Sequence, residues 1–315
     1  MSQDVAPGAV RPAAAKPAAR PDEGRWVPYL FIGPLALYLL LLQFYPLVQE
    51  LLLSFTSTSL LSPRDHTYVG LDNYRNLIAA SDFHQVLLVT FVYTIACVVL
   101  AVGLGLAAAM LLDQPFRGRG VARALVTIPW AAPPVAVALV FVWIFNAQYG
   151  VFNFVLRSLG FESGQENWLD SPELALPAIL ITTIWQIFPF AAVVILAALQ
   201  GVSSELREAA IIDGADRLSV FGAVVWPTIR PSVALLALFL TIWSIRRFDL
   251  IWLMTQGGPI GATETLVIKL YREGFVYRDL GQAASVGMIG VAIALLVTFV
   301  YFHFTRRAEI AEGRR

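Results

Sequence analysis

The sequence predicts an all-α integral membrane protein with six transmembrane helices, and three observations support this fold class. The 315-residue chain is 58% hydrophobic and only 14% charged, whereas a typical soluble domain is about 45–50% apolar and about 25% charged. Its mean hydropathy is +0.70. Six apolar segments are each close to the ~20 residues that a helix needs to cross a bilayer. Most of the chain is therefore expected to lie in lipid.

The six expected spans alternate with shorter, more polar segments. Their approximate limits are 29–54, 86–112, 121–146, 174–200, 232–255 and 283–304. The third contains Pro129, Pro133 and Pro134, and the fourth contains Pro177 and Pro189. A proline inside a spanning helix frees a backbone carbonyl that neighbouring helices must satisfy. These two helices are therefore expected to pack inside the bundle and to be kinked.

The segments outside the spans define the domain organisation. Residues 1–25 are rich in Ala, Pro and Arg without apolar periodicity, which predicts a disordered cytoplasmic tail. The apolar run that follows is too long for a signal-peptide core and has no small-residue cleavage site after it, so cleavage is not expected. A membrane domain is expected over 26–305, with a cytoplasmic loop at 201–231. A second cytoplasmic tail is expected at 306–315.

The distribution of Lys and Arg predicts which side of the membrane each segment faces. Most of these residues lie in the two tails and in the segments after the second and fourth spans, and cytoplasmic segments carry such an excess. Both termini and the loop at 201–231 are therefore expected in the cytoplasm. The formal net charge of zero gives no sign of nucleic-acid binding.

Residues that often carry chemistry are sparse. Cys97, the single cysteine, lies in an apolar run and is expected to be a small apolar filler. The histidines at positions 66, 84 and 303 lack a ligand partner at suitable spacing, so no metal site is predicted. The sequence contains no G-x-x-x-x-G-K-[S/T] loop for phosphate. The glycines Gly103 and Gly105 in the second span instead indicate close packing between helices.

The segment from Glu208 to Pro231, EAAIIDGADRLSVFGAVVWPTIRP, is unusual for a connection between two spans. Ser203 and Ser204 can cap a short helix whose first turn carries Glu205, because a serine side chain can accept a hydrogen bond from a first-turn N–H. Gly214 can end that helix in the left-handed conformation without strain. The sequence therefore predicts a short surface helix here.

A second amphipathic piece over 218–226 is expected to stop at Pro227, so that the whole segment forms a helix–turn–helix at the membrane surface. Its apolar side would face the bundle, through Leu206, Ala210, Val220 and Val224. One interpretation is an interfacial helix that packs only on its own protein.

The spacing within this segment favours another interpretation. Glu208-Ala209-Ala210 is followed by Gly214 six residues after the glutamate and by Pro227 thirteen residues after the glycine. The pattern resembles the EAA loop of permease subunits of binding-protein-dependent ABC importers, in which this loop is a coupling helix that docks on the ATPase subunit. Val224 and Trp226 depart from the commonest form and remain apolar. The resemblance implies the type I ABC importer permease fold and an ATPase contact through Glu208, Ala209, Ala210, Asp213, Gly214 and Pro227.

Other stretches resemble the sugar-permease branch of that family, the maltose and glycerol-phosphate type. They are residues 248–259, 262–266 and 68–74, and the resemblance as a whole covers about residues 28–305. Within the branch the chain is similar to trehalose importers of mycobacteria, so the resemblance implies a sugar substrate such as the disaccharide trehalose. Because no motif names the sugar, a glycerol phosphate or an oligosaccharide stays open.

The resemblance also implies partners and a location. The chain would assemble with a second, different permease subunit and two ATPase subunits, and an external substrate-binding protein would deliver the sugar. ATP and Mg²⁺ would bind the ATPase subunits, whereas this chain would hold no cofactor and would not be an enzyme. The expected location is the bacterial plasma (inner) membrane, crossed several times.

Three charged residues, Arg246, Arg247 and Asp249, lie inside the predicted fifth span, where charge is rare and indicates function by default. Helical spacing puts Arg247 on one face with Leu240 and Ser244, and lets Arg246 reach Asp249 as a structural ion pair. In the family that the chain resembles, the sugar site is lined by positions that match Leu240, Ser244, Arg247, Ile187 and Phe190. The alternative is that Arg247 extends to the outer interface, ~15 Å away by helix rise.

Trp185 and Gln186 precede the proline of the fourth span and extend the candidate substrate pathway. An aromatic face beside an amide suits a sugar, which offers a C–H face and a hydroxyl edge. Packing alone is the alternative for Trp185. Trp130 and Trp143 lie toward opposite ends of the third span and are expected to be interface anchors.

Two other classes of protein stay open. A multi-span membrane enzyme would need an acid–base or metal-binding cluster at one membrane face. Glu162, Glu166, Asp170 and Glu173 do gather in one loop, but without a His or Lys partner, and a solvated loop explains them. A free-standing secondary transporter would often show two repeats in one chain, and the sequence shows no such repeat.

Overall fold

The structure is a computed structural model that describes residues 27–161 and 166–311. The tail predicted over 1–25 lies outside the described residues, as does the chain beyond 311. The described residues fall into two compact units, which divide between Gln49 and Glu50. The first unit holds α1 (Val27–Leu39), the π-helical turn η1 (Leu40–Phe44) and the start of α2 (Tyr45–Leu53).

Helices that are long and apolar enough to cross a membrane occur where the sequence predicts spans. In the described residues they are Tyr29–Leu53, Ser81–Asp113, Ala175–Leu199, Arg217–Ile245 and Leu280–Arg307, and a bent pair, Arg119–Ala131 with Pro134–Ile144, supplies a sixth span when it is counted as one. The predicted fold class, an all-α membrane protein with six spanning segments, is confirmed.

The third span is broken into two helices, so the prediction of one continuous kinked helix over 121–146 is wrong. α5 (Arg119–Ala131) and α6 (Pro134–Ile144) meet at 91°. Ala132 and Pro133 between them are extended, with ψ angles of 135° and 132°. A residue that precedes proline is pushed out of the helical region, and here two such residues follow each other. Pro134 then begins α6, a position where its missing N–H leaves no bond unmade.

The fifth span begins and ends earlier than predicted. α10 (Arg217–Val220), the π-helical turn η2 (Phe221–Val225) and α11 (Trp226–Ile245) form one continuous helical segment. The expected stop at Pro227 is therefore wrong, because this proline lies in the first turn of α11 and follows a π-helical turn, a local adjustment that accommodates a missing N–H. At the other end α11 stops at Ile245, and α12 (Asp249–Thr255) is a separate helix.

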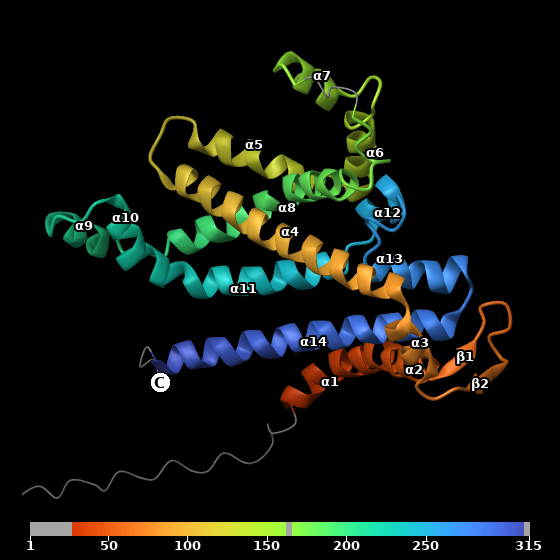
Figure 1. The fold of residues 1–315 in the computed structure, drawn as a ribbon. Helices are drawn as coiled ribbons and strands as arrows, with labels where there is room; N and C mark the ends of the chain where they lie inside the picture. Colours follow the sequence, from red (N-terminus) through yellow and green to blue (C-terminus); the bar gives the residue numbers. More distant parts are fainter. Residues whose placement is uncertain (1–26, 162–165, 312–315) are drawn as a thin grey trace, which may run out of the picture. The chain divides into compact units, whose positions relative to one another are not determined.

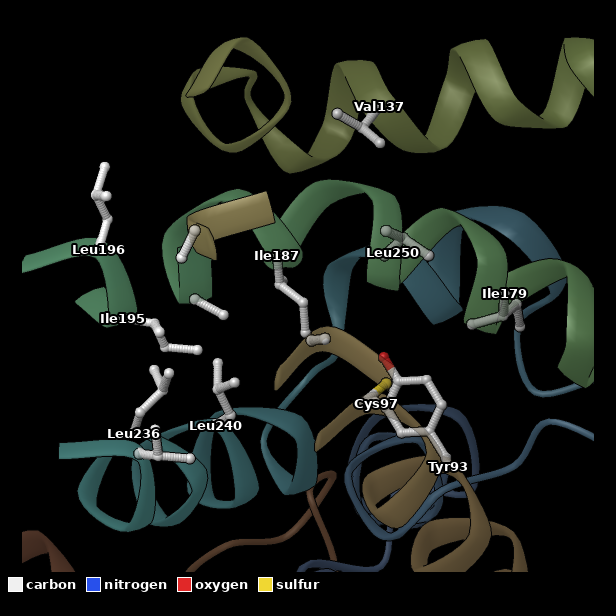
Figure 2. Close-up of a cluster of buried hydrophobic side chains, with 14 of the residues drawn as sticks. Tyr93, Cys97, Val137, Ile179, Ile187, Ile195, Leu196, Leu236, Leu240 and Leu250 are labelled. Carbon is white, nitrogen blue, oxygen red and sulfur yellow. The ribbon is translucent and has the colours of Figure 1, made fainter. Parts of the chain in front are cut away.

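Two long helices form the centre of the larger unit. α4 (Ser81–Asp113) and α8 (Ala175–Leu199) pack along each other, with α11 beside them (Figure 1). Gly105 of α4 lies against Ala191 and Ala192 of α8, as the predicted close packing requires, whereas Gly103 faces open space. Figure 2 shows the buried side chains between the helices, among them Cys97, Ile187, Ile195, Leu236 and Leu240.

Shorter elements lie at the two ends of these long helices (Figure 1). α9 (Ser204–Ile212) and α10 lie at one end. At the other end β1 (Thr56–Thr58) and β2 (His66–Tyr68) pair antiparallel, with Thr56 opposite Tyr68. The remaining elements are α3 (Asp72–Ala79), α7 (Val151–Ser158), α13 (Leu266–Tyr271), the π-helical turn η3 (Arg272–Val276) and α14 (Leu280–Ala311).

Candidate functional site

Arg247 lies just past the end of α11, and its side chain points into the bundle. The guanidinium Nη2 donates a hydrogen bond to the Gln186 side-chain oxygen. Gln186 is near the middle of α8, so this contact places the guanidinium near mid-depth of that helix. The geometry does not fit an arginine that extends to the outer interface. The Nε of Arg247 is buried and has no hydrogen-bond partner among the described residues.

Gln186 connects three elements of the bundle. It is 3% exposed, and its Nε2 donates to the backbone oxygen of Ala132 at 3.2 Å. Ala132 lies at the break between α5 and α6, so α8 supplies a donor to the backbone of the broken span. The amide therefore bridges Arg247 at the end of α11 and the break in the third span. A fixed polar bridge in an apolar interior is costly unless all its members are paired.

The same region is lined by further polar side chains that were not predicted from the sequence. The Tyr93 hydroxyl of α4 is hydrogen-bonded to the Thr183 hydroxyl of α8 at 3.0 Å, and both residues are buried. Ser244 near the end of α11 is buried as well. Cys97 follows Tyr93 by one helical turn, and Figure 2 shows its sulfur near the Tyr93 hydroxyl. Polar residues at helical spacing on α4, Thr90, Tyr93 and Cys97, were the available sequence signal.

The other predicted pathway residues are distributed over different surroundings. Leu240 and Ile187 are buried in the apolar core (Figure 2). Trp185 and Gln186 do not share a face, because consecutive helical residues point about 100° apart. The Trp185 ring is 5.2 Å from the ring of Phe141. In this structure Trp185 therefore packs beside the site rather than completing an aromatic and amide pair with Gln186.

Phe190 belongs to an aromatic cluster one helical turn from Gln186. Its ring stacks on Trp130 with centroids 5.4 Å apart, and it lies 5.8 Å from Phe239 and 5.7 Å from Trp243. Trp130 was expected at the interface, and it is exposed while it also stacks on Phe190 of α8. Trp143 is exposed, as an interface anchor would be.

The predicted ion pair between Arg246 and Asp249 does not form. Both side chains are exposed, and no ion pair links these two described residues. The prediction assumed a continuous helix, in which offset three brings the side chains together. Because α11 ends at Ile245 and α12 begins at Asp249, Arg246 lies in the turn between the two helices and not on the helix that carries Asp249.

The short helix predicted before Gly214 is present as α9. The Ser203 hydroxyl accepts a hydrogen bond from the Leu206 N–H, which caps the first turn. At the other end Gly214 has a φ of 86°, with its N–H bonded to Ile211 and the N–H of Ala215 bonded to Ala210. These two bonds form a Schellman motif, the standard glycine-dependent end of a helix.

α9 presents an exposed mixture of charged and apolar side chains. None of its nine residues, all of them described, is buried. Glu208 and Asp213 are exposed, and Ile212 beside them is 84% exposed. Leu206, which was expected to face the bundle, is exposed too, so that expectation is wrong. A helix with this many unpacked apolar side chains has the properties of a contact surface.

A charged cluster at the opposite end of the bundle joins α13 to α4. Lys269 Nζ lies 2.9 Å from Asp82 Oδ2 and 3.1 Å from Glu273 Oε1. Burial alone would lower the pKa of Lys269, but hydrogen bonds to both carboxylates outweigh it, so the pKa of this amine is raised above its ordinary value. The cluster is fully paired and stabilises the packing of α13.

The acidic loop considered for an enzyme does not form a metal centre in the described residues. Glu162 lies outside them, and Glu173 accepts a hydrogen bond from Ser171 at 2.9 Å. Within the described ranges no three His, Cys, Asp or Glu side chains come together as metal ligands.

Comparison with known proteins then decides the family. Residues 101–310 match the family described as "Binding-protein-dependent transport system inner membrane component". The chain belongs to this family. It is therefore an ABC transporter permease subunit, a multi-pass inner-membrane protein and not an enzyme.

Sequence relatives match nearly the whole chain. The sulfoquinovosyl glycerol transport system permease SmoG of Agrobacterium fabrum is 34% identical over 90% of this chain and 92% of its own length. The trehalose/maltose transport system permease MalF of Thermococcus litoralis is 33% identical over 88% and 93%. The diacetylchitobiose uptake permease DasB of Streptomyces coelicolor is 31% identical over 91% and 88%.

A solved structure supports the fold. The bacterial alginate ABC transporter, in complex with an alginate pentasaccharide-bound periplasmic protein, superposes with a TM-score of 0.79 over 91% of this chain and 96% of the other, at 21% identity. The predicted type I importer permease fold is confirmed.

Proposed function

We propose that this permease subunit moves a sugar, delivered by an external binding protein, across the membrane into the cytoplasm. ATP hydrolysis would occur on two partner ATPase subunits that hold ATP and Mg²⁺, while this chain binds no cofactor. The observation that carries the proposal is the polar bridge from Arg247 through Gln186 to Ala132, in the interior of the helix bundle. Polar and charged side chains at such depth are expensive and mark solute pathways.

The bridge can serve a polar solute because its members can exchange partners. A guanidinium has five N–H donors and a glutamine amide both donates and accepts. A sugar hydroxyl entering the site can therefore replace the contact between Arg247 and Gln186 without leaving either group unpaired. The proposed pathway lining is Trp185, Gln186, Ile187, Phe190, Leu240, Ser244 and Arg247. Because Leu240 and Ile187 are buried, they would have to separate as the solute passes.

The names of relatives support a sugar, and a disaccharide such as trehalose is the first candidate. MalF of Thermococcus litoralis is named for trehalose and maltose, and DasB for diacetylchitobiose. A second candidate is a sugar glycoside with an anionic group. The relative SmoG is named for sulfoquinovosyl glycerol, and Arg247 brings a buried Nε–H that has no protein partner among the described residues. A charged donor of this kind favours an anionic acceptor.

We assign α9 the proposed role of contacting the ATPase subunit. Glu208, Asp213 and the exposed Ile212 would form the face that docks on an ATPase subunit, with Ala209 and Ala210 allowing a close approach. Gly214 sets the turn that ends the helix. Pro227 would not serve as a hinge, because it lies within one continuous helical segment from Arg217 to Ile245. A push on α9 would reach the span through the short turn at Gly214 and then through this continuous helical segment.

Assembly and sidedness follow the same proposal. A second, different permease subunit would complete the pathway. Both termini and α9 would face the cytoplasm, in line with the excess of Lys and Arg on those segments. The end of α14 lies at the same end of the larger unit as α9 (Figure 1), which is consistent with this arrangement.

The experiment that tests the coupling surface is co-purification with the neighbouring subunits combined with sugar uptake. Glu208→Lys and Gly214→Pro should each abolish uptake and reduce recovery of the ATPase subunit, while membrane insertion stays intact. Glu173→Lys is the matched control, because it makes the same charge change on an exposed residue before the other end of α8. Normal uptake in both α9 variants would refute the docking role.

The pathway and the substrate need separate measurements. Arg247→Ala should change uptake and substrate-stimulated ATPase activity far more than assembly, whereas Arg246→Ala, on the exposed neighbour, should change them little. The solute retained by the cognate binding protein distinguishes the candidates. Retention of a neutral disaccharide would support the first, and retention of an anionic glycoside alone would support the second.

A further inference from the structure

One side chain of α9 contacts the ends of two long helices, α4 and α8. Arg207 of α9 places its Nη1 3.3 Å from Asp113 Oδ2, and its Nη2 donates to the Leu199 backbone oxygen at 3.2 Å. Asp113 is the last residue of α4, and Leu199 is the last residue of α8. The side chains of Arg207 and Asp113 are 30% and 25% exposed. A pair that is mostly removed from water is more directional and less screened than a surface pair.

Apolar packing between α9 and the bundle is weak by comparison. A groove of about 610 Å³ separates them, lined by Met110, Leu199, Ile211 and Phe221 as well as by the ion pair. α9 itself buries none of its residues. Across this groove, the contact of Arg207 is therefore the main direct connection from α9 to α4 and α8.

The helices that receive this contact carry the polar site. Tyr93 lies on α4, whereas Thr183 and Gln186 lie on α8. The two helices are also in tight contact at Gly105 and Ala191. A displacement of their neighbouring ends, at Asp113 and Leu199, would therefore move both helices together. A continuous path of hydrogen bonds and stiff helices thus leads from Arg207 to the bridge at Gln186.

We propose that Arg207 is the positioning residue that transmits movement of α9 to the paired ends of α4 and α8. The inference rests on the proposed function, because it assumes that an ATPase subunit moves α9. Arginine suits the role, since its planar guanidinium can hold a carboxylate and a backbone carbonyl at once in fixed directions. The exposed face of α9 would bind the ATPase, and Arg207 on its inner side would carry the displacement into the membrane.

The test uses the assembled transporter and separates coupling from assembly. In Arg207→Gln, recovery of the ATPase subunit and its basal ATP hydrolysis should stay unchanged. Uptake per ATP hydrolysed should fall about tenfold, the factor that corresponds to ~1.4 kcal/mol, close to the loss of one charged hydrogen bond. Arg119→Gln is the matched control, because it removes an exposed arginine at the start of α5 and should leave the ratio unchanged.

A charge exchange shows whether the pair itself is responsible. Arg207→Asp and Asp113→Arg should each uncouple uptake, and the double variant should recover part of it, because the ion pair is restored while the bond to Leu199 is not. Wild-type coupling in Arg207→Gln, or a double variant no better than the singles, would overturn the proposal. Loss of the ATPase subunit in Arg207→Gln would overturn it as well, since it would assign Arg207 to docking. A wild-type chain that never assembles with an ATPase would instead refute the proposed function.

Discussion

The contact between α4 and α8 should tolerate no added methyl group at Gly105. A Cβ built on Gly105 would lie 2.7 Å from the Ala191 Cβ, 2.9 Å from the Ala192 N and 3.0 Å from the Ala191 carbonyl carbon. These atoms are backbone or the shortest of side chains, so none can rotate away. Gly105→Ala therefore requires α8 to move. Gly103→Ala on the same helix meets no atom within 4 Å.

The two substitutions have the same effect on helix propensity and differ in the cost of added volume. Alanine is favoured over glycine in a helix by about 1 kcal/mol in both cases. Forcing extra volume into a packed core costs about 1–3 kcal/mol, and only Gly105→Ala incurs that cost. The free energy of unfolding should therefore differ between the two variants by about 1–3 kcal/mol, with Gly103→Ala the more stable. At roughly 2–4 °C per kcal/mol for chains of about 150–250 residues, this is a difference of several degrees in Tm.

Thermal unfolding of both variants and the parent in the same detergent measures this difference. Gly103→Ala should melt at or slightly above the parent, and Gly105→Ala below both. If Gly105→Ala melts as high as Gly103→Ala, the close approach of α4 to α8 is not a constraint on this fold, and the reasoning that couples the two helices fails.

Three further predictions concern other parts of the larger unit. Gln186→Met should destabilise the fold by about 3 kcal/mol, because it leaves the Arg247 guanidinium and the Ala132 carbonyl without their partner; adding Arg247→Met should restore part of the Tm, and no restoration would show that the two side chains act independently. Gly214→Ala should cost about 1–2 kcal/mol through backbone strain alone, because its φ is 86° and the space beside it is open, and Gly214→Asn should cost less; equal Tm values for all three proteins would contradict this. Lys269 has a raised pKa in the folded chain, so its contribution is fully present below the ordinary value of 10.5 and is lost as the pH rises through the folded value; the Tm deficit of Lys269→Met should therefore be clear at pH 8 and shrink above about pH 10.5, and a deficit independent of pH would exclude the ion pairs as its cause.

The parts of the fold that could be predicted are those that lipid or local backbone chemistry dictates. A segment that crosses a bilayer must satisfy its backbone internally, so long apolar runs become helices whatever their neighbours are. The end of α9 was predictable for a different reason, since Gly214 takes the left-handed conformation that a Schellman motif needs. Both signals are contained in a few consecutive residues.

Proline shows where such local reasoning stops. Pro133 and Pro134 break the third span at 91°, whereas Pro227 lies inside a continuous helical segment. The difference is positional: Pro133 and Pro134 are adjacent, which forces two successive residues out of the helical region, whereas Pro227 follows a π-helical turn that accommodates it. A hydropathy pattern contains neither the π-helical turn nor the angle.

The polar bridge could not be predicted from the sequence because it depends on where two helices are interrupted. Had the fifth helix continued to residue 255, Arg247 would share a face with Ser244 and Arg246 would pair with Asp249. Instead α11 ends at Ile245, which separates Arg246 from Asp249 and leaves Arg247 able to reach Gln186 on another helix. The break at Ala132 supplies the third member of the bridge. Two departures from regular helix thus meet at one glutamine, which hydrogen-bonds to both of them, and this favours Gln186 as the centre of the site.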